Sequence, residues 1–188
     1  MKRINHNDKV CILFSTADWD EPYWTNKQHN TQALASLGIT VLYVESVGLR
    51  GPKISSGKDW KRIANRFVKG FIALLFGARE KDANVYVLSP LQIPAGFRYQ
   101  LLKKTNEFIL NYMVNSFLKS KRAVRPIIWT YHPYIMGVLD HLNYSSVLYH
   151  CVDDLSKIPG VDSEHFKLSE INLIVRSSAV STTSKSLY

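Results

Sequence analysis

The sequence predicts an α/β fold with a doubly wound, mainly parallel β-sheet and helices on both of its faces. Two observations lead to this prediction. Short apolar runs rich in β-branched and aromatic residues recur along the 188 residues, and segments with helical spacing of apolar side chains separate most of them. Hydrophobic residues make up 46% of the chain, which is enough to form the core of one domain.

The predicted strands are short and begin close to the N-terminus. The first covers residues 10–14 (VCILF) and is apolar throughout, as in a parallel strand buried on both faces. The others are expected at residues 39–44, 85–88, 126–131, 147–152 and 179–183. Cys11 and Cys151 fall within these runs. We therefore expect two buried free thiols, which are typical of a reducing compartment.

Helices are predicted between most of the strands, at residues 25–37, 98–119, 134–142 and 164–177. In the first helix we expect one set of residues to face inward, namely Ala33, Leu34 and Leu37. We expect a second set to face outward, namely Lys27, Gln28 and Gln32. The last strand leads into residues 184–188, which are typical of a helix start, so we expect one domain over residues 1–188 that is truncated before a second.

The net charge of +9 is concentrated in one stretch. Residues 50–81 hold nine Lys and Arg against Asp59 and Glu80, a local charge of +7, and the rest of the chain contributes +2. From Lys58 onward, apolar and basic residues alternate at helical spacing, which predicts an amphipathic insertion suited to an anionic membrane surface. The residues expected to contact the membrane are Trp60, Lys61, Arg62, Arg66, Phe67 and Lys69. Two alternatives remain, an ordinary helix packed on the sheet and, less favoured, a nucleic-acid contact.

Several enzyme classes are disfavoured by missing motifs. Residues 15–20, after the first strand, contain no glycine, whereas a dinucleotide fingerprint requires glycines in this turn. The sequence also has no Walker A motif and no Gly-x-Ser-x-Gly elbow. No apolar run reaches the roughly 20 residues that span a bilayer, and no signal peptide precedes the domain, so a cytoplasmic location is expected.

The loops beyond the carboxyl ends of the strands are the expected working loops of such a sheet. Residues 17–24 (ADWDEPYW) combine aromatic planes with carboxylates, which suits recognition of a sugar ring with an apolar face and a rim of hydroxyls. The alternative is a solvated loop whose Trp residues cover the core. The residues expected to bind a sugar acceptor are Trp19, Asp20, Glu21, Trp24, Tyr131 and His132.

A general base for a transfer reaction is expected among the carboxylates at the strand ends. Asp153 and Asp154 are the first candidates, because adjacent carboxylates raise one another's pKa. The alternative is that they cap the following helix. Asp18 is the next candidate, with Asp20 and His132 in reserve. No metal site is expected, because strand alternation places His150 and Cys151 on opposite faces.

Four segments together resemble bacterial glycosyltransferases that build cell-surface polysaccharides. They are residues 24–29 (WTNKQH), 34–45 (LASLGITVLYVE), 148–159 (LYHCVDDLSKIP) and 181–188 (STTSKSLY). Teichuronic-acid type glycosyltransferases and the membrane-associated xanthan glucuronosyltransferase are the comparisons that these segments suggest. The individual motifs are only moderately specific.

The resemblance implies one Rossmann-like half of a GT-B fold, the half that binds the acceptor. It implies a sugar transferred from a nucleotide-sugar donor to a lipid-linked or glycan acceptor at the inner face of the membrane, with no metal or other cofactor bound by this domain. The donor domain is absent from the sequence, so we expect the chain alone to be inactive. The alternative is a non-catalytic α/β binding module that uses its basic patch for an anionic partner.

Overall fold

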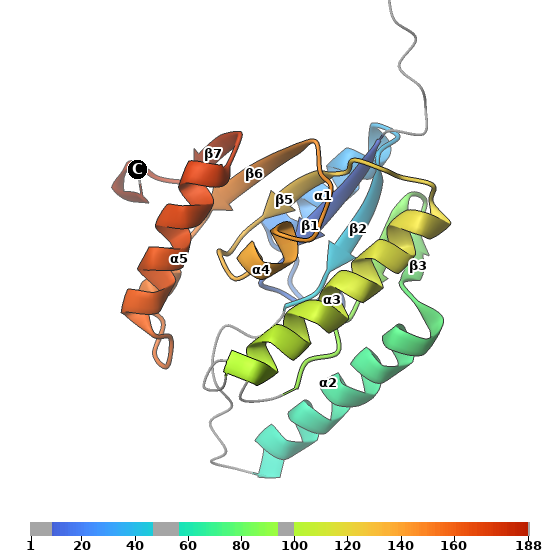
Figure 1. Cartoon of the computed structure of the whole chain (residues 1–188), viewed down its shortest axis with the longest axis horizontal. Helices are drawn as coiled ribbons and strands as arrows, with labels where there is room; N and C mark the ends of the chain where they lie inside the picture. The colour runs from blue at the N-terminus through green and yellow to red at the C-terminus, as the bar shows by residue number, and fades with distance from the viewer. Residues whose placement is uncertain (1–8, 47–56, 94–99, 188) are drawn as a thin grey trace, which may run out of the picture.

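The computed structural model describes residues 9–46, 57–93 and 100–187, with side chains described in these ranges except at 57–63 and 186. A seven-stranded sheet runs through the chain in the order β3-β4-β2-β1-β5-β6-β7 (Figure 1). Its strands are β1 (Val10–Phe14), β2 (Thr40–Val44), β3 (Arg79–Asp82), β4 (Val85–Leu88), β5 (Ile127–Thr130), β6 (Ser146–Cys151) and β7 (Ala179–Thr182). All neighbouring strands are parallel except the antiparallel pair β3-β4. The predicted α/β, Rossmann-like class is confirmed.

Five helices connect the described strands. They are α1 (Asn26–Ser36), α2 (Gly57–Phe76), α3 (Gln100–Ser120), α4 (Met136–Leu139) and α5 (Ser163–Arg176), with 3₁₀ turns η2 (Leu155–Lys157) and η3 (Lys185–Leu187). The bounds agree closely with the sequence prediction except for α4, which is much shorter than the predicted 134–142. Near the C-terminus, the predicted helix start at 184–188 is the 3₁₀ turn η3 in the described part.

The two faces of the sheet carry different layers (Figure 1). On the face that we call the α3 face, α2, α3, α4 and α5 pack over strand residues such as Ile12, Leu42 and Ile128 to form the larger core. On the opposite face, called the α1 face, α1 packs over a smaller cluster that includes Leu13, Tyr43 and Trp129. Cys11 and Cys151 are both buried and free, as predicted.

The orientation predicted for α1 is wrong for most of the named residues, although Leu34 packs against the α1-face cluster as predicted. Lys27 and Gln28 are buried, whereas Leu37 is 70% exposed and Ala33 is exposed. Gln28 is held inside by polar contacts, because its side-chain oxygen accepts from the Thr25 backbone N–H at 3.0 Å and its amide donates to a loop carbonyl at 3.0 Å. The buried face of α1 is therefore polar in its first turns, and an apolar-periodicity argument selects the wrong side.

Strand β3 was not predicted from the sequence. Its residues are REKD, all exposed, so they lack the apolar signal of a buried strand. The strand exists because it closes a hairpin with β4, at the outer edge of the sheet. Asn84, in the turn between the two strands, has a positive φ of 62°, a conformation that Asn tolerates better than most residues.

Candidate functional site

The carboxyl ends of β1 and β5 form the topological switch point of the sheet. From β1 the chain moves outward to β2 and β4 on one side and later to β5, β6 and β7 on the other. The connections that leave β1 and β5 therefore diverge, and such crevices are where open α/β sheets bind ligands. The loop at residues 15–25 and the segment at residues 131–135 border this position.

Hydrogen bonds to β2 and β4 fix the loop that follows β1. The Ser15 hydroxyl lies 2.6 Å from the Tyr43 hydroxyl, which donates to the Ala17 carbonyl at 3.0 Å. Glu45 is buried, and its carboxylate accepts from the Trp19 backbone N–H at 2.9 Å and also from the Ser89 hydroxyl. These contacts hold the start of the loop in one conformation.

Of the two tryptophans predicted to bind a sugar acceptor, one is buried and one is accessible. Trp19 is 6% exposed and packs with its ring 5.1 Å from that of Tyr43 and 5.1 Å from that of Trp24. Trp24 is 41% exposed and also contacts the His29 ring at 5.8 Å. Trp19 thus fits the alternative of a core-covering residue, while Trp24 and the exposed Glu21 remain available to a ligand.

The two loop aspartates pair with the insertion between β2 and β4. Asp18 accepts from Arg66 of α2 at 3.2 Å, and Asp20 accepts from Lys81 of β3 at 2.9 Å. The Lys81 hydrogen bond is the largest cause that holds the pKa of Asp20 below its ordinary value. Both carboxylates are therefore engaged in ion pairs that join the loop to the basic insertion.

At the end of β5, Tyr131 and His132 are both buried. Burial raises the pKa of Tyr131 to about 12, so its hydroxyl is neutral at pH 7, and this oxygen accepts from the Asn30 amide at 2.9 Å. His132 is 1% exposed, and neither ring nitrogen has a hydrogen-bond partner among the described residues. Burial lowers the pKa of His132 to about 4, which keeps the imidazole neutral but out of contact with solvent.

The two aspartates after β6 have different surroundings. Asp154 accepts from the Ser156 hydroxyl at 2.6 Å and pairs with Lys157 at 3.1 Å. These contacts, with the Ser156 hydroxyl first, lower the pKa of Asp154, so the expectation that adjacent carboxylates raise one another's pKa is wrong for this residue. Asp154 also accepts from the Ser156 backbone N–H at the start of η2, which is the capping role given as the alternative.

Asp153, directly after β6, is a carboxylate without a committed partner among the described residues. It is exposed, and its side chain has no hydrogen bond or ion pair within the described ranges. Its charge acts on the buried ammonium of Lys27, whose pKa it raises against the larger lowering effect of burial. Asp153 is thus an accessible carboxylate beside a cation and an aromatic cluster.

Sequence reasoning missed the polar residues that α1 and β6 contribute beside Tyr131. Lys27 Nζ lies 5.3 Å from the centre of the Tyr131 ring, and the His150 ring lies 5.1 Å from it. Trp129 adjoins the same rings. The register of β5 and β6 could have indicated the Tyr131–His150 neighbourhood, but no sequence pattern indicates that Lys27 turns inward.

The predicted membrane-contact residues lie on α2. The side chains of Trp60, Lys61 and Arg62 lie outside the described residues, whereas Arg66, Phe67 and Lys69 are all exposed. Apolar exposure continues to the end of the helix, through Val68, Phe71, Ile72, Leu75 and Phe76, with exposed fractions between 46% and 81%. Gly70 and Ala73 are buried and Leu74 packs partly buried against the larger core, so α2 contacts the molecule through these residues.

Metal-binding groups and membrane-spanning helices bear on the chemistry of the chain. Within the described ranges, no three His, Cys, Asp or Glu side chains are grouped so that they could hold a metal ion. No helix in those ranges has the length and apolar content that crossing a bilayer requires. No protein-family model matches the chain and no curated protein matches it either, so the functional proposal rests on the fold and the geometry of the site.

Proposed function

We propose that this chain is the acceptor-binding domain of a glycosyltransferase, in which a nucleotide-sugar donor is held mainly by a second domain and Asp153 is the general base. The observation that carries the proposal is the free carboxylate of Asp153 at the carboxyl edge of the sheet. Asp18, Asp20, Glu45 and Asp154 have partners, and Glu21, which is also exposed, lies further along the loop that follows β1. A base must be free to accept a proton from the acceptor hydroxyl.

Accessible groups at the carboxyl edge of the sheet support a polyhydroxylated acceptor. The partly exposed Trp24 offers an aromatic plane on the β1 side of the switch point, and Glu21 of the same loop is exposed, whereas Tyr131 on the β5 side is buried. An accessible aromatic plane together with carboxylates matches the alternating apolar and polar surfaces of a sugar. In the reaction, the Asp153 carboxylate would accept the hydroxyl proton as the acceptor oxygen attacks the donor sugar carbon and the nucleotide leaves.

Sugar transfer by the full-length gene product tests the base assignment. Asp153→Asn should lower kcat by about a hundredfold or more, the usual contribution of a general base. Asp154→Asn is the matched control, because its carboxylate caps η2, and we expect a change of less than tenfold. Near-normal rates in both variants would exclude the assignment. Sequencing the source gene past the Tyr188 codon separates the transferase from a non-catalytic binding module, which needs no donor domain.

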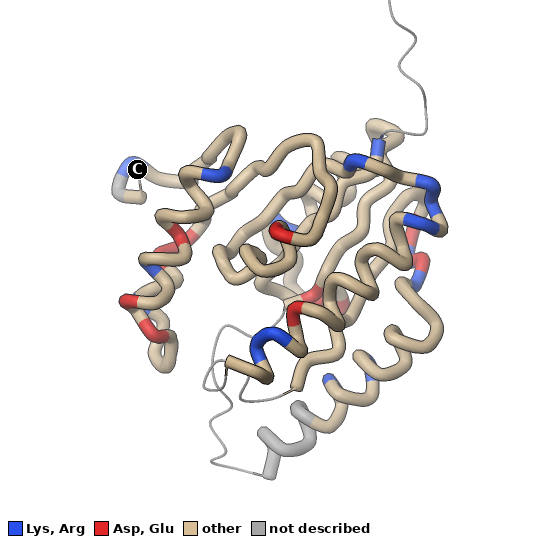
Figure 2. Tube along the Cα trace, viewed as in Figure 1, with Lys and Arg blue, Asp and Glu red and all other residues tan. Residues whose placement is uncertain are grey.

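The same proposal places the domain at an anionic membrane surface through α2. Six large apolar residues cover the outer side of its C-terminal half: Phe67, Val68, Phe71, Ile72, Leu75 and Phe76. Arg66 and Lys69 are exposed on the same helix. The coloured part of α2 carries Lys or Arg positions and no Asp or Glu (Figure 2). An exposed apolar face bordered by cations is the pattern of a helix that lies in the headgroup region of a bilayer. Each cation near an anionic surface adds about 1 kcal/mol to binding.

Co-sedimentation with vesicles that contain anionic lipid tests this placement. Phe71→Ser with Phe76→Ser should abolish binding, and Lys69→Ser should weaken it by about fivefold, the equivalent of about 1 kcal/mol. Leu168→Ser with Val175→Ser is the matched control, because these exposed apolar residues lie on α5. Equal loss in the control, or binding that survives in the α2 variant, would contradict the proposal.

A further inference from the structure

Lys27 is a buried cation without an ion pair. It is 7% exposed, and its ammonium donates one long hydrogen bond, at 3.4 Å, to the side-chain oxygen of Asn26. The ion pairs of the described chain use Arg66, Lys81, Lys157 and Arg176 instead. Burial lowers the pKa of Lys27. The charge of Asp153 opposes this effect only in part, so an anion bound beside Lys27 would further reduce the cost of burying the ammonium.

The position of Lys27 in α1 adds to the cost of burying its charge. It is the second residue of an eleven-residue helix whose first turn contains no acidic side chain. The N-terminus of a helix stabilises anions and is an unfavourable place for a cation. A negative group bound beside Lys27 would interact favourably with both the ammonium and the helix end.

Two more donors from other elements reach the same place. The Tyr131 oxygen accepts from Asn30, so its own hydroxyl hydrogen is left to donate. On β6, His150 lies next to Tyr131, and its Nδ1 is buried without a hydrogen-bond partner among the described residues. Burial and the charge of Lys27 lower the pKa of His150, so the neutral imidazole carries one N–H. The ammonium of Lys27 and the ring of His150 thus lie 5.3 Å and 5.1 Å from the centre of the Tyr131 ring, so the three side chains are neighbours.

We propose that Lys27, Tyr131 and His150 bind the phosphate group of an organic phosphate. A phosphate oxygen accepts charge-assisted hydrogen bonds from an ammonium and further bonds from neutral donors, which matches this set in charge and in number of donors. The inference does not depend on the proposed sugar transfer, because it concerns binding of the anion by this chain alone.

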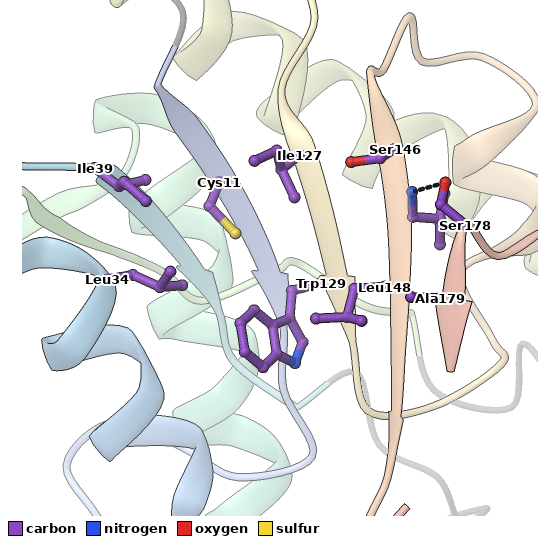
Figure 3. A pocket seen from close by; sticks show the side chains of 10 residues that line it. Cys11, Leu34, Ile39, Ile127, Trp129, Ser146, Leu148, Ser178 and Ala179 are labelled. Atoms are coloured by element: carbon purple, nitrogen blue, oxygen red, sulfur yellow. Dashed lines mark hydrogen bonds between the residues drawn. The ribbon is translucent and has the colours of Figure 1, made fainter. Parts of the chain in front are cut away.

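An apolar groove beside the donors offers room for the organic part. It has a volume of about 300 Å³ and lies over β5, β6 and β7 next to α1 (Figure 3). Its lining includes Leu34, Ile127, Leu148 and Ala179, and its Trp129 contacts both Tyr131 and His150. A phosphate ester with an apolar chain could therefore place its phosphate at Lys27 and its chain along the groove.

Calorimetric titration of the chain with inorganic phosphate and with n-decyl phosphate tests the site. We expect Lys27→Met to weaken binding of the phosphate probe at least tenfold, as expected for losing a charge-assisted hydrogen bond. Tyr131→Phe is the second variant, since it removes a hydroxyl and keeps the ring. Lys167→Met, an exposed lysine on α5, is the control and should bind as the parent does.

The two probes distinguish the sources of the phosphate. Equal affinity of both probes assigns the site to a free or polar phosphate, whereas tighter binding of n-decyl phosphate, weakened by Leu148→Asp, assigns it to a lipid-like phosphate. Both results uphold the site. Failure of both probes to bind the parent chain, or binding unchanged in Lys27→Met and Tyr131→Phe, would overturn it.

Discussion

The two faces of the sheet are covered very differently. On the α3 face, four helices bury a continuous apolar core from Leu88 to Val147. On the α1 face, one helix covers β1, β2 and β4, and the strands β5 to β7 keep a groove. Ile127, which lines this groove, is 37% exposed, although parallel strands are normally buried on both faces.

The two faces also differ in the kinds of side chain that they carry. The α3 face buries a large apolar cluster together with a few polar groups, such as Asn106 and Asn111 of α3. The α1 face places Tyr43, Tyr131 and His150 at the carboxyl ends of its strands. We infer a division between the two faces. The α3 face contributes most of the folding stability, and the α1 face carries the groups that contact ligands. The predictions below test this division, from the largest expected effect to the smallest.

The largest effect is expected from a cavity on the α3 face. Ile128→Ala removes a fully buried side chain and should lower the free energy of unfolding by about 2–5 kcal/mol. The matched change on the α1 face, Leu148→Ala, should lower it by less than about 1 kcal/mol, because Leu148 lines the open groove. Urea denaturation measures both values. Equal losses would show that the α1 face is a core too, and the division would fail.

The second effect is the pH dependence that buried His132 causes. Its pKa is 6.5 when exposed and about 4 in the fold, so the unfolded chain binds more protons between these values. Above pH 6.5, the titration of His132 does not lower the free energy of unfolding. As the pH falls toward 4, this free energy decreases by roughly 3 kcal/mol in total.

His132→Leu should remove this pH dependence. Because neither ring nitrogen has a described partner, the substitution should change stability little at pH 7.5. Urea denaturation between pH 7.5 and 4 measures the difference. The contribution of His150, whose pKa is also lowered by burial, cancels because it is present in both proteins. An unchanged pH profile in the variant would place the acid sensitivity elsewhere.

The third effect concerns how α2 joins the α3 face. A Cβ added at Gly70 would lie 2.6 Å from the Leu91 Cα, which is backbone and cannot rotate away. Gly70→Ala should therefore cost about 1–3 kcal/mol despite the better helix propensity of alanine. Asn65→Ala, at an exposed position of the same helix, is the control and should be neutral or slightly stabilising. A stabilising Gly70→Ala would mean that α2 is only loosely packed.

The elements that can be predicted from the sequence are those with a local pattern of apolar residues. The strands and the long helices follow from local apolar patterns, and runs such as VCILF allow few alternatives. The edge strand β3 has no such pattern, and α1 buries polar residues, so both were missed or misoriented. The spacing of apolar residues predicts which apolar side chains are buried, but it does not predict which polar side chains are buried.

The candidate site was harder to predict because its contacts join distant segments. Asp18 and Asp20 were expected to face a ligand, yet each pairs with a cation 48 or 61 residues away. The sequence shows that both signs of charge exist but not which ones meet. Asp153 and Asp154 are adjacent in sequence, and the structure separates them by a local feature, the capping contact of Asp154 with Ser156.

The smallest effect is expected for the ion pair between the loop and α2. Asp18 and Arg66 are 30% and 55% exposed, so their coupling in a double-mutant cycle with Asp18→Asn and Arg66→Gln should be about 0.2–1 kcal/mol. The coupling should shrink as salt rises from about 0.1 M to 1 M, because the screening length falls from about 10 Å to 3 Å. A coupling above about 2 kcal/mol, insensitive to salt, would indicate that the pair is shielded from water. The loop after β1 and α2 would then move as one unit.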